Sequence, residues 1–392
     1  MPMKQYPAEE VAQNSRQESS NRATSEGAVQ YPWLDWVRFA AALQVLLVHA
    51  RFFTFVEYGQ LDAGSKSKLT ALWFALTRTG LESVLVFFVL SGFLVGGKVI
   101  ERVANGTFDS RSYTIDRFSR IYTPLVPALL FALFIDLFFK SPPNVAEYIG
   151  NLFSFQGVFV DPVHTIGSIW SLSYEIWFYI LAGALAVVLL RRSRSSTGAL
   201  LLLLCAFIIF GRLQASLLFC WVLGALVYLC PRKNFSKPET VSGFVLLGLG
   251  SLMIQLSTSS NSLSVFSRYP IIAPAGQIIL SSGIALILRN LCTITTTSGN
   301  KSSFARLGSA LAAFSYTLYL IHYPVMIALQ RMGYARQPAI SGGNLWLFVM
   351  RIVVCLLVSY GFYWMFERNT PIIRRLLRTR LTSPTKRVVP VR

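Results

Sequence analysis

Charged side chains are scarce in this sequence. Only 14% of its 392 residues are Asp, Glu, Lys or Arg, while 54% are hydrophobic; a soluble protein carries roughly 25% charged residues. Apolar runs such as 180–190 and 199–210 recur along the chain, and many stretches approach the roughly 20 apolar residues that cross a bilayer as a helix. The composition therefore excludes an ordinary water-soluble protein and predicts an all-α, polytopic membrane protein.

Paired cysteines and an apolar leader are also missing. The five cysteines lie singly within or at the ends of apolar segments, which predicts small buried side chains and not disulfides. Residues 1–30 are polar, so we expect a disordered cytoplasmic tail without a cleavable signal peptide. His164 has only Asp161 close to it in sequence, whereas a zinc site needs at least three protein ligands. We therefore expect no metal ion and no tightly bound cofactor.

Acidic residues are outnumbered by basic ones, 17 to 36, and the net charge is +19. Such a charge can indicate nucleic-acid binding. Here, however, the basic residues sit in short segments between apolar runs, where they orient membrane helices and contact anionic lipids. We therefore expect a lipid bilayer, and no nucleic acid, as partner. Residues 31–378 are predicted to form one transmembrane domain, and residues 379–392 a basic, disordered cytoplasmic tail.

Ten segments are predicted to span the membrane. The fifth and sixth nearly fuse at residues 211–214, so they form either two short helices or one long tilted helix. With ten helices and a cytoplasmic N-terminus, 25 Lys and Arg residues fall in cytoplasmic segments and nine in external segments. Merging the fifth and sixth spans into one helix would reverse every later loop, which would put 14 of the basic residues in those loops outside and three inside. The positive-inside rule therefore favours ten helices with both termini in the cytoplasm. The spans are 33–53, 82–100, 121–139, 169–190, 198–211, 214–230, 240–256, 270–289, 309–330 and 344–366, and residues 111–120 are expected to form a short amphipathic surface helix.

Histidine is rare, and two of the three histidines, His49 and His322, fall inside predicted spans. Arg38 and His49 are eleven residues apart, a rotation that ends about 20° past three full turns, so both project from one helix face about 16 Å apart along the axis. An arginine at a helix centre costs about 2.5–3.5 kcal/mol and usually faces the protein interior. The alternative is that Arg38 snorkels to lipid phosphates and His49 only packs, but their shared face favours a functional role.

Five motifs follow one another along the chain. They are LDWVR at 34–38 with His49 beyond it, FFVLSGF at 87–93, RFSRIY at 117–122, WSLSYE at 170–175 and SYTLYLIHYP at 315–324. In this order they resemble the acyltransferase-3 family, membrane proteins that acylate sugars and other hydroxyl acceptors. The chain departs from the family's pattern at Thr123, which separates Tyr122 from Pro124, and at Ile176, where the family often has an acidic residue. The resemblance, from about residue 33 to 376, implies a membrane-bound O-acyltransferase.

Acyl transfer from a thioester to a hydroxyl needs a base, and His49 is the expected one, with Glu175 as the group that orients it. Arg38 is expected to pair with a phosphate of the donor or to stabilise the oxyanion. The acyl-CoA-binding residues are expected to be Arg117, Arg120 and Tyr122, and the cavity-lining residues Ser91, Trp170, Ser173, Tyr319 and His322. Each of these residues also has a purely structural alternative. Glu175 can form a hydrogen bond between helices, and Arg117 and Arg120 can serve only to orient the protein in the membrane. Ser91 and Gly92 can serve close helix packing, and His322 can lie at an interfacial kink beside Pro324.

The expected reaction moves an acyl group, expected to be acetyl, from cytoplasmic acyl-CoA to a hydroxyl of a glycan, glycolipid or other small acceptor. The expected location is the cell inner membrane. Transfer is either direct, with His49 as general base, or passes through a covalent acyl-enzyme. The alternative function is a transporter or lipid flippase, but the sequence shows no internal repeat of the kind that many transporters have. The acceptor and the oligomeric state stay open.

Overall fold

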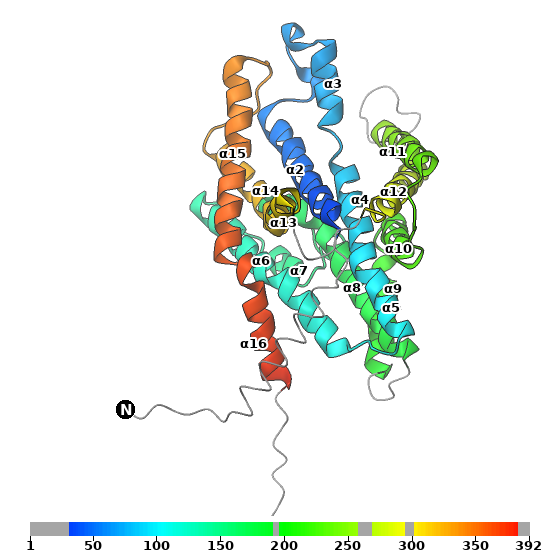
Figure 1. Ribbon diagram of the computed structural model, residues 1–392. Helices are drawn as coiled ribbons and strands as arrows, with labels where there is room; N and C mark the ends of the chain where they lie inside the picture. The colour runs from blue at the N-terminus through cyan, green and yellow to red at the C-terminus, as the bar shows by residue number, and fades with distance from the viewer. Residues whose placement is uncertain (1–30, 191–195, 258–268, 295–301, 383–392) are drawn as a thin grey trace, which may run out of the picture.

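The computed structural model describes residues 31–190, 196–257, 269–294 and 302–382. These residues form helices and loops without a β-strand (Figure 1), which confirms the predicted all-α fold. The tail predicted at 1–30 lies outside the described residues. Helix α16 continues to Thr382, past the start predicted for the C-terminal tail, and the remainder of that tail is not described.

Short 3-10 or π-helical turns, labelled η, join several of the helices. In chain order the elements are α2 (Pro32–Thr54), η1 (Tyr58–Gln60), η2 (Ala63–Ser65), α3 (Lys68–Leu76), α4 (Gly80–Ser91), η3 (Gly92–Gly97), α5 (Lys98–Ala104), α6 (Ser110–Phe138), α7 (Val145–Leu152), η4 (His164–Ile169), α8 (Trp170–Leu189), α9 (Ser196–Phe210), α10 (Ala215–Leu229), α11 (Lys237–Ser257), α12 (Ile272–Leu291), α13 (Ser303–Ala313), α14 (Ser315–Arg331), α15 (Gly342–Met365), η6 (Glu367–Asn369) and α16 (Thr370–Thr382).

Within the described ranges, seven helical stretches are long and apolar enough to cross a membrane, and the pair α13–α14, bent by 45°, can form an eighth span. Helices α9 and α10 are apolar but have 15 residues each. At 1.5 Å per residue they measure about 22 Å, less than the roughly 30 Å of a bilayer core. They are two separate helices, as the charge distribution predicts. The predicted count of ten spans is therefore approximate.

The bundle has two ends, which we call inner and outer. The inner end, at the bottom of Figure 1, holds the start of α6, the end of α8 and helix α16. The outer end, at the top, holds α3 and the start of α15. The distribution of basic residues predicts that the inner end faces the cytoplasm.

Helix α6 is one continuous helix of 29 residues and not the predicted surface helix followed by a span. Its first turn is capped by Asp109, which accepts from the backbone amides of Arg111 and Ser112 at 3.3 and 3.0 Å. Arg378 of α16 pairs with Asp116 of α6 at 2.8 Å, so the basic C-terminal helix is fastened beside the start of α6. The predicted boundary between a surface helix at 111–120 and a span at 121–139 is absent, because one α-helix runs through both segments.

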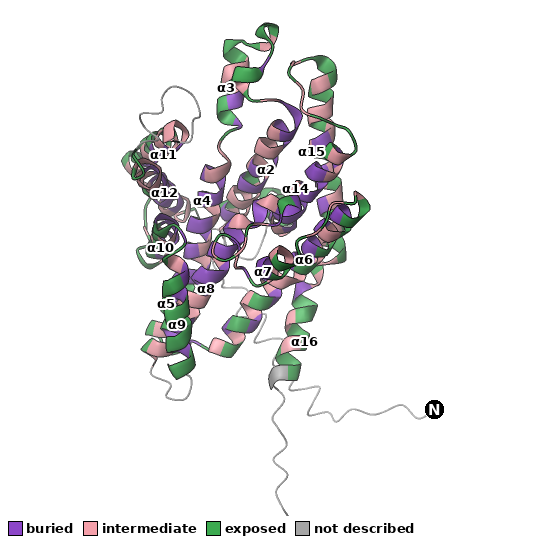
Figure 2. Cartoon of the chain, turned by 180° about the vertical axis from the view of Figure 1, so that it is seen from behind, coloured by how far each residue is buried: buried purple, intermediate pink, exposed green. Residues whose placement is uncertain are grey.

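Helices α2, α4, α8 and α14 form the centre of the bundle. Figure 2 shows many buried residues on these helices and mostly exposed residues on α5 and α9. Helix α14 packs against α2, α6 and α15, and α2 packs against α4. Helices α11 and α12 pack against each other and join the bundle through α10 and α4. Polar side chains on the central helices are therefore held inside the protein.

Two glycines let α4 and α10 cross at very close range. A Cβ added to Gly92, which begins the π-helical turn η3, would lie 1.8 Å from the carbonyl oxygen of Trp221. A Cβ added to Gly224 would lie 1.9 Å from the carbonyl oxygen of Val89. Small residues are typical of such close helix contacts in membranes, so the close packing considered for Gly92 is observed.

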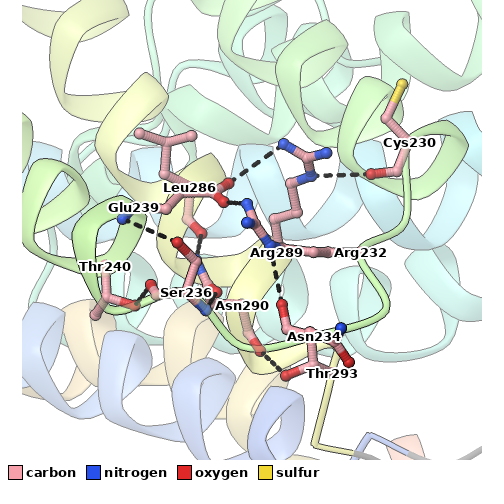
Figure 3. Close-up of polar contacts among 10 residues, drawn as sticks. All are labelled: Cys230, Arg232, Asn234, Ser236, Glu239, Thr240, Leu286, Arg289, Asn290 and Thr293. Atoms are coloured by element: carbon pink, nitrogen blue, oxygen red, sulfur yellow. Dashed lines mark hydrogen bonds and ion pairs between the residues drawn. The ribbon is translucent and has the colours of Figure 1, made fainter.

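The loop between α10 and α11 is fastened to the last turn of α12 (Figure 3). Arg289 of α12 donates to the carbonyl oxygen of Cys230 at 3.0 Å and pairs with Glu239 at 3.3 Å. Glu239 also pairs with Arg232. Two of the basic residues that predict orientation therefore also hold a loop in place.

The glycine crossing predicts the effect of one added methyl group. Gly224→Ala should lower the melting temperature of the detergent-purified protein by several degrees, because overpacking of a tight contact costs about 1–3 kcal/mol. Gly248→Ala on α11 is the matched control, since a Cβ there has nothing within 4 Å; its melting temperature should stay the same or rise slightly. Equal melting of both variants would contradict the close crossing.

Candidate functional site

A cavity of about 330 Å³ lies among the central helices, with walls from α2, α4, η3, α5, α6, α8 and α14. Its charged wall residues are four cations, Arg38, Lys98, Arg117 and Arg120, and one carboxylate, Glu175. The predicted residues Ser91 and Tyr319 also line it. The cavity therefore has an excess of positive charge inside an apolar bundle, which suits an anionic ligand.

Three other predicted site residues, Tyr122, Trp170 and Ser173, do not line this cavity. Tyr122 lies 200° round the helix from Arg120 and stacks on Phe118, with ring centroids 4.5 Å apart. It lines a neighbouring groove between α6, α8 and α9, which shares Arg117 and Tyr179 with the cavity. Ser173 donates to the carbonyl oxygen of Trp170 within α8 at 2.9 Å. Trp170 packs edge-on against Tyr174, with ring centroids 6.0 Å apart. A contiguous motif cannot place all its residues on one face of a helix.

A second cavity, of about 520 Å³, adjoins the first toward the inner end. The two share the wall residues Arg38, Leu94 and Lys98. The second cavity is otherwise lined from the start of α2, from α13 and by Tyr228 of α10. Arg38, which pairs with Asp35 at 3.5 Å, therefore stands where the two cavities meet.

Glu175 ends a chain of hydrogen bonds that joins α10, α4 and α8. Trp221 Nε1 donates to Ser91 Oγ at 3.2 Å, and Ser91 donates to the hydroxyl of Tyr179 at 3.1 Å. Tyr179 in turn donates to the carboxylate of Glu175. Each hydroxyl of the chain both accepts and donates, so the chain is fully satisfied. Ser91 therefore contributes a hydrogen bond in addition to helix packing.

His49 contacts His322 and not Glu175, its predicted partner. Nδ1 of His49 lies 2.9 Å from the carbonyl oxygen of Val45 and 3.1 Å from Nε2 of His322. Nδ1 of His322 lies 2.9 Å from the carbonyl oxygen of Leu318. A carbonyl oxygen can only accept, so these contacts assign a proton to Nδ1 of both rings. The orienting group for His49 therefore comes from α14 and not from α8.

This assignment leaves one nitrogen available for chemistry. Nε2 of His322 accepts from the Nδ1–H of His49, so Nε2 of His49 keeps its lone pair. None of the described side chains forms a hydrogen bond with that atom. The Tyr323 ring packs edge-on against His49, with centroids 5.2 Å apart. The contacts thus hold His49 as a neutral imidazole with a free basic nitrogen.

The cavity wall on α14 stops at Tyr319. The hydroxyl of Tyr319 donates to the carbonyl oxygen of Ser168 at 2.5 Å and lies 2.7 Å from Ser171 Oγ. Its ring centroid is 6.1 Å from that of His322. Among the described residues that line the cavity, neither His49 nor His322 is included. The histidine pair therefore lies less than one helical turn beyond the cavity, with Tyr319 next to it.

The site contains groups that sequence reasoning missed. Glu367, which is buried, accepts from the amide and hydroxyl of Thr317 at 3.1 and 2.5 Å and lies 3.8 Å from Arg120. It therefore balances part of the charge of a predicted donor-binding arginine. Tyr179 follows Glu175 by four residues, a helical spacing that is visible in the sequence. Glu367 carries no such signal, because it is far along the chain from both of its partners.

The fold and the site define a class of protein. It is a multi-pass helical membrane protein with a positively charged interior cavity beside a neutral histidine pair; within the described chain no group of three His, Cys, Asp or Glu could hold a metal ion. A family model described as an acyltransferase domain matches residues 31–364. The chain therefore belongs to the acyltransferase-3 family, as the motifs indicate. No curated protein and no solved structure matches the chain.

The hydrogen-bond chain predicts that Tyr179→Phe destabilises the protein. Loss of the hydroxyl leaves Ser91 and Glu175 without this partner, at a cost of about 1–3 kcal/mol, and the melting temperature should fall. Tyr360→Phe is the control, because this half-exposed side chain forms no hydrogen bond with described residues. A Tyr179→Phe protein that melts like wild type would rule out the chain as a stabilising element.

Proposed function

We propose that this protein is an O-acyltransferase that moves an acyl group, acetyl as the sequence predicts, from acyl-CoA to a hydroxyl of a glycan, glycolipid or other small acceptor. Membership of the family supports acyl transfer. The observation that carries the choice of donor is the cavity, whose four cations face one carboxylate and match the phosphates of a CoA thioester. The proposal places the protein in the cell inner membrane with both termini in the cytoplasm.

The proposed donor enters from the inner end. Arg38 stands where the two cavities meet, and Lys98 and Arg117 add charge to the same wall. Arg38 and His49 are about 16 Å apart along the axis of α2, and Arg38 lines both cavities whereas His49 is not among the described residues that line either one. This separation supports a phosphate-binding role for Arg38 and not the alternative role of stabilising the oxyanion. The thioester end then lies toward Tyr319.

The proposed base is Nε2 of His49. It removes the proton of the acceptor hydroxyl while the hydroxyl oxygen attacks the thioester carbonyl carbon. The carbon–sulfur bond breaks, the ester forms, and the proton passes from His49 to the departing CoA thiolate. His322 accepts from the Nδ1–H of His49 at 3.1 Å and so orients the ring and stabilises its charged form, as the third group of a catalytic triad does. His322 is therefore a positioning residue.

His49→Ala should reduce acyl transfer by about 10²–10⁴-fold, the usual contribution of a general base. Transfer is measured as O-acetylation of surface glycans by mass spectrometry in cells that express the variant at the wild-type level. The matched control is His164→Ala, which removes an exposed histidine and should leave acetylation unchanged. Full acetylation by the His49 variant would refute the proposed base.

The histidine pair predicts different effects for two variants of His322. His322→Leu removes the acceptor for the Nδ1–H of His49 and should lower kcat roughly tenfold to a hundredfold, with the KM for acetyl-CoA unchanged. His322→Gln retains an acceptor and should recover part of the loss. Equal activity of the two variants would show that the contact with His49 does not position the base.

A further inference from the structure

Three arginines gather at the outer end of α2, beyond the histidine pair. Arg51 lies in the last turn of α2, Arg78 follows α3, and Arg336 lies in the loop between α14 and α15. Arg51 lies over the ring of Phe74, which is four residues before Arg78, and Arg336 lies over the ring of Phe52, the residue after Arg51. We call these three residues the outer arginine cluster. Its position requires a reason, because basic residues favour the cytoplasmic side of a membrane protein.

Arg51 is buried with much of its hydrogen-bonding capacity unused. It is 3% exposed, and its guanidinium lies over Phe74, 4.7 Å from the ring centroid. The carboxylate that pairs with it is Glu57, which is 3.9 Å away and half exposed. Nε and Nη1 of Arg51 form no hydrogen bond within the described chain. Buried donors of this kind usually have a partner, so these nitrogens are available to hydrogen-bond an anionic ligand.

Arg336 places a second guanidinium close to His49. Its Cζ lies 3.7 Å from the ring centroid of Phe52, and its Nε has no partner in the described parts of the chain. Phe52 follows His49 by three residues and therefore lies on the same side of α2, about one turn further out. The guanidinium of Arg336 is thus placed just beyond the proposed base, toward the outer end.

Arg351 of α15, which is outside the outer arginine cluster, is a second buried arginine near the histidine pair. Arg351 is 0% exposed, and it donates to the carbonyl oxygen of Tyr334. Its Nε and Nη1 are unbonded as far as the described residues show. One turn along α15, the thiol of Cys355 contacts the carbonyl oxygen of His322 at 3.5 Å. The histidine pair therefore has a guanidinium group near it on two sides, Arg336 beside α2 and Arg351 on α15.

We propose that the outer arginine cluster binds an oxyanion, either a carboxylate or a phosphate, carried by the acceptor whose hydroxyl reaches His49. The inference rests on the proposed function and narrows the acceptor to an anionic one. Guanidinium groups bind both oxyanions with paired hydrogen bonds. Their field also concentrates an anionic acceptor near the base. A neutral acceptor would leave the unbonded guanidinium donors of the cluster unused.

The phosphate of a bilayer lipid has the same chemistry as a phosphorylated acceptor. Arg78 is exposed and can meet a lipid headgroup. Arg51 is nearly inaccessible from the surface, and Arg336 packs on the side of α2 that carries His49. These positions favour a ligand that enters beside the base over one that stays in the lipid phase.

The first test compares acceptors that differ in charge. Purified protein in phosphatidylcholine liposomes receives acetyl-CoA with glucose, glucuronate or glucose 6-phosphate as probe, and the products are measured by mass spectrometry. Wild type should show a KM for each anionic probe about tenfold below that for glucose, the factor expected from one charge-assisted hydrogen bond. Arg336→Gln should abolish this difference without changing the KM for acetyl-CoA. Equal KM values for all three probes in wild type would overturn the proposal.

The second test measures binding of the same probes by calorimetry without acetyl-CoA. Both anionic probes should bind wild type and the control Arg212→Gln, an exposed arginine between α9 and α10, equally well. They should bind Arg336→Gln and Arg78→Gln roughly tenfold more weakly. Charge-dependent binding without any transfer would contradict the proposed function and support this inference. Absence of charge-dependent binding, or competition by phosphatidylglycerol that depends on Arg336, would overturn the inference.

Discussion

A charge inside an apolar bundle must be paired or hydrogen-bonded, because an uncompensated one is costly where water is absent. Glu82, buried in α4, accepts from Ser251 at 2.8 Å and from Gln255 at 2.7 Å and so fastens α4 to α11. Asp136 pairs with Arg331 at 2.8 Å and fastens α6 to α14. These groups use much of their bonding capacity within the protein. The cavity and the outer arginine cluster differ from these pairs because their cations outnumber the neighbouring carboxylates, and they are the sites proposed for the donor and the acceptor.

The geometry of the cavity depends on how closely two helices cross. Gly92 and Gly224 let the backbones of η3 and α10 touch, and this contact brings Trp221 within 3.2 Å of Ser91. From Ser91 the hydrogen bonds continue through a tyrosine to Glu175. A packing detail of two glycines therefore sets the orientation of the one carboxylate in the cavity wall. Loss of the crossing would disturb the site even though neither glycine touches a ligand.

The sequence predicts which face of a helix points into the protein better than it predicts the residue that lies opposite on another helix. Helical periodicity places Arg38 on an interior face, and Arg38 does line the cavity. Periodicity along one helix contains no information about which other helix lies opposite. The predicted partner of His49 was therefore Glu175, whereas the structure provides His322, 273 positions away in the chain. The same limit explains Glu367, whose position beside Arg120 follows only from the packing of α6 against η6.

The distribution of charge along α2 explains how the proposed reaction can hold an anionic donor and an anionic acceptor at opposite ends of one site. Cations gather around Arg38 at the inner end and around Arg51 at the outer end, and the hydrogen bonds between them hold His49 and His322 as neutral rings. Neither a CoA phosphate nor an anionic acceptor can enter this neutral middle without losing its counter-charges. The thioester and the uncharged part of the donor next to it carry no such counter-charges, so they can enter the zone at low cost. In the proposed reaction, the charged ends of donor and acceptor can therefore each stay on their own side, bound by separate cationic sites, while the thioester reaches past Tyr319 to the hydroxyl at His49.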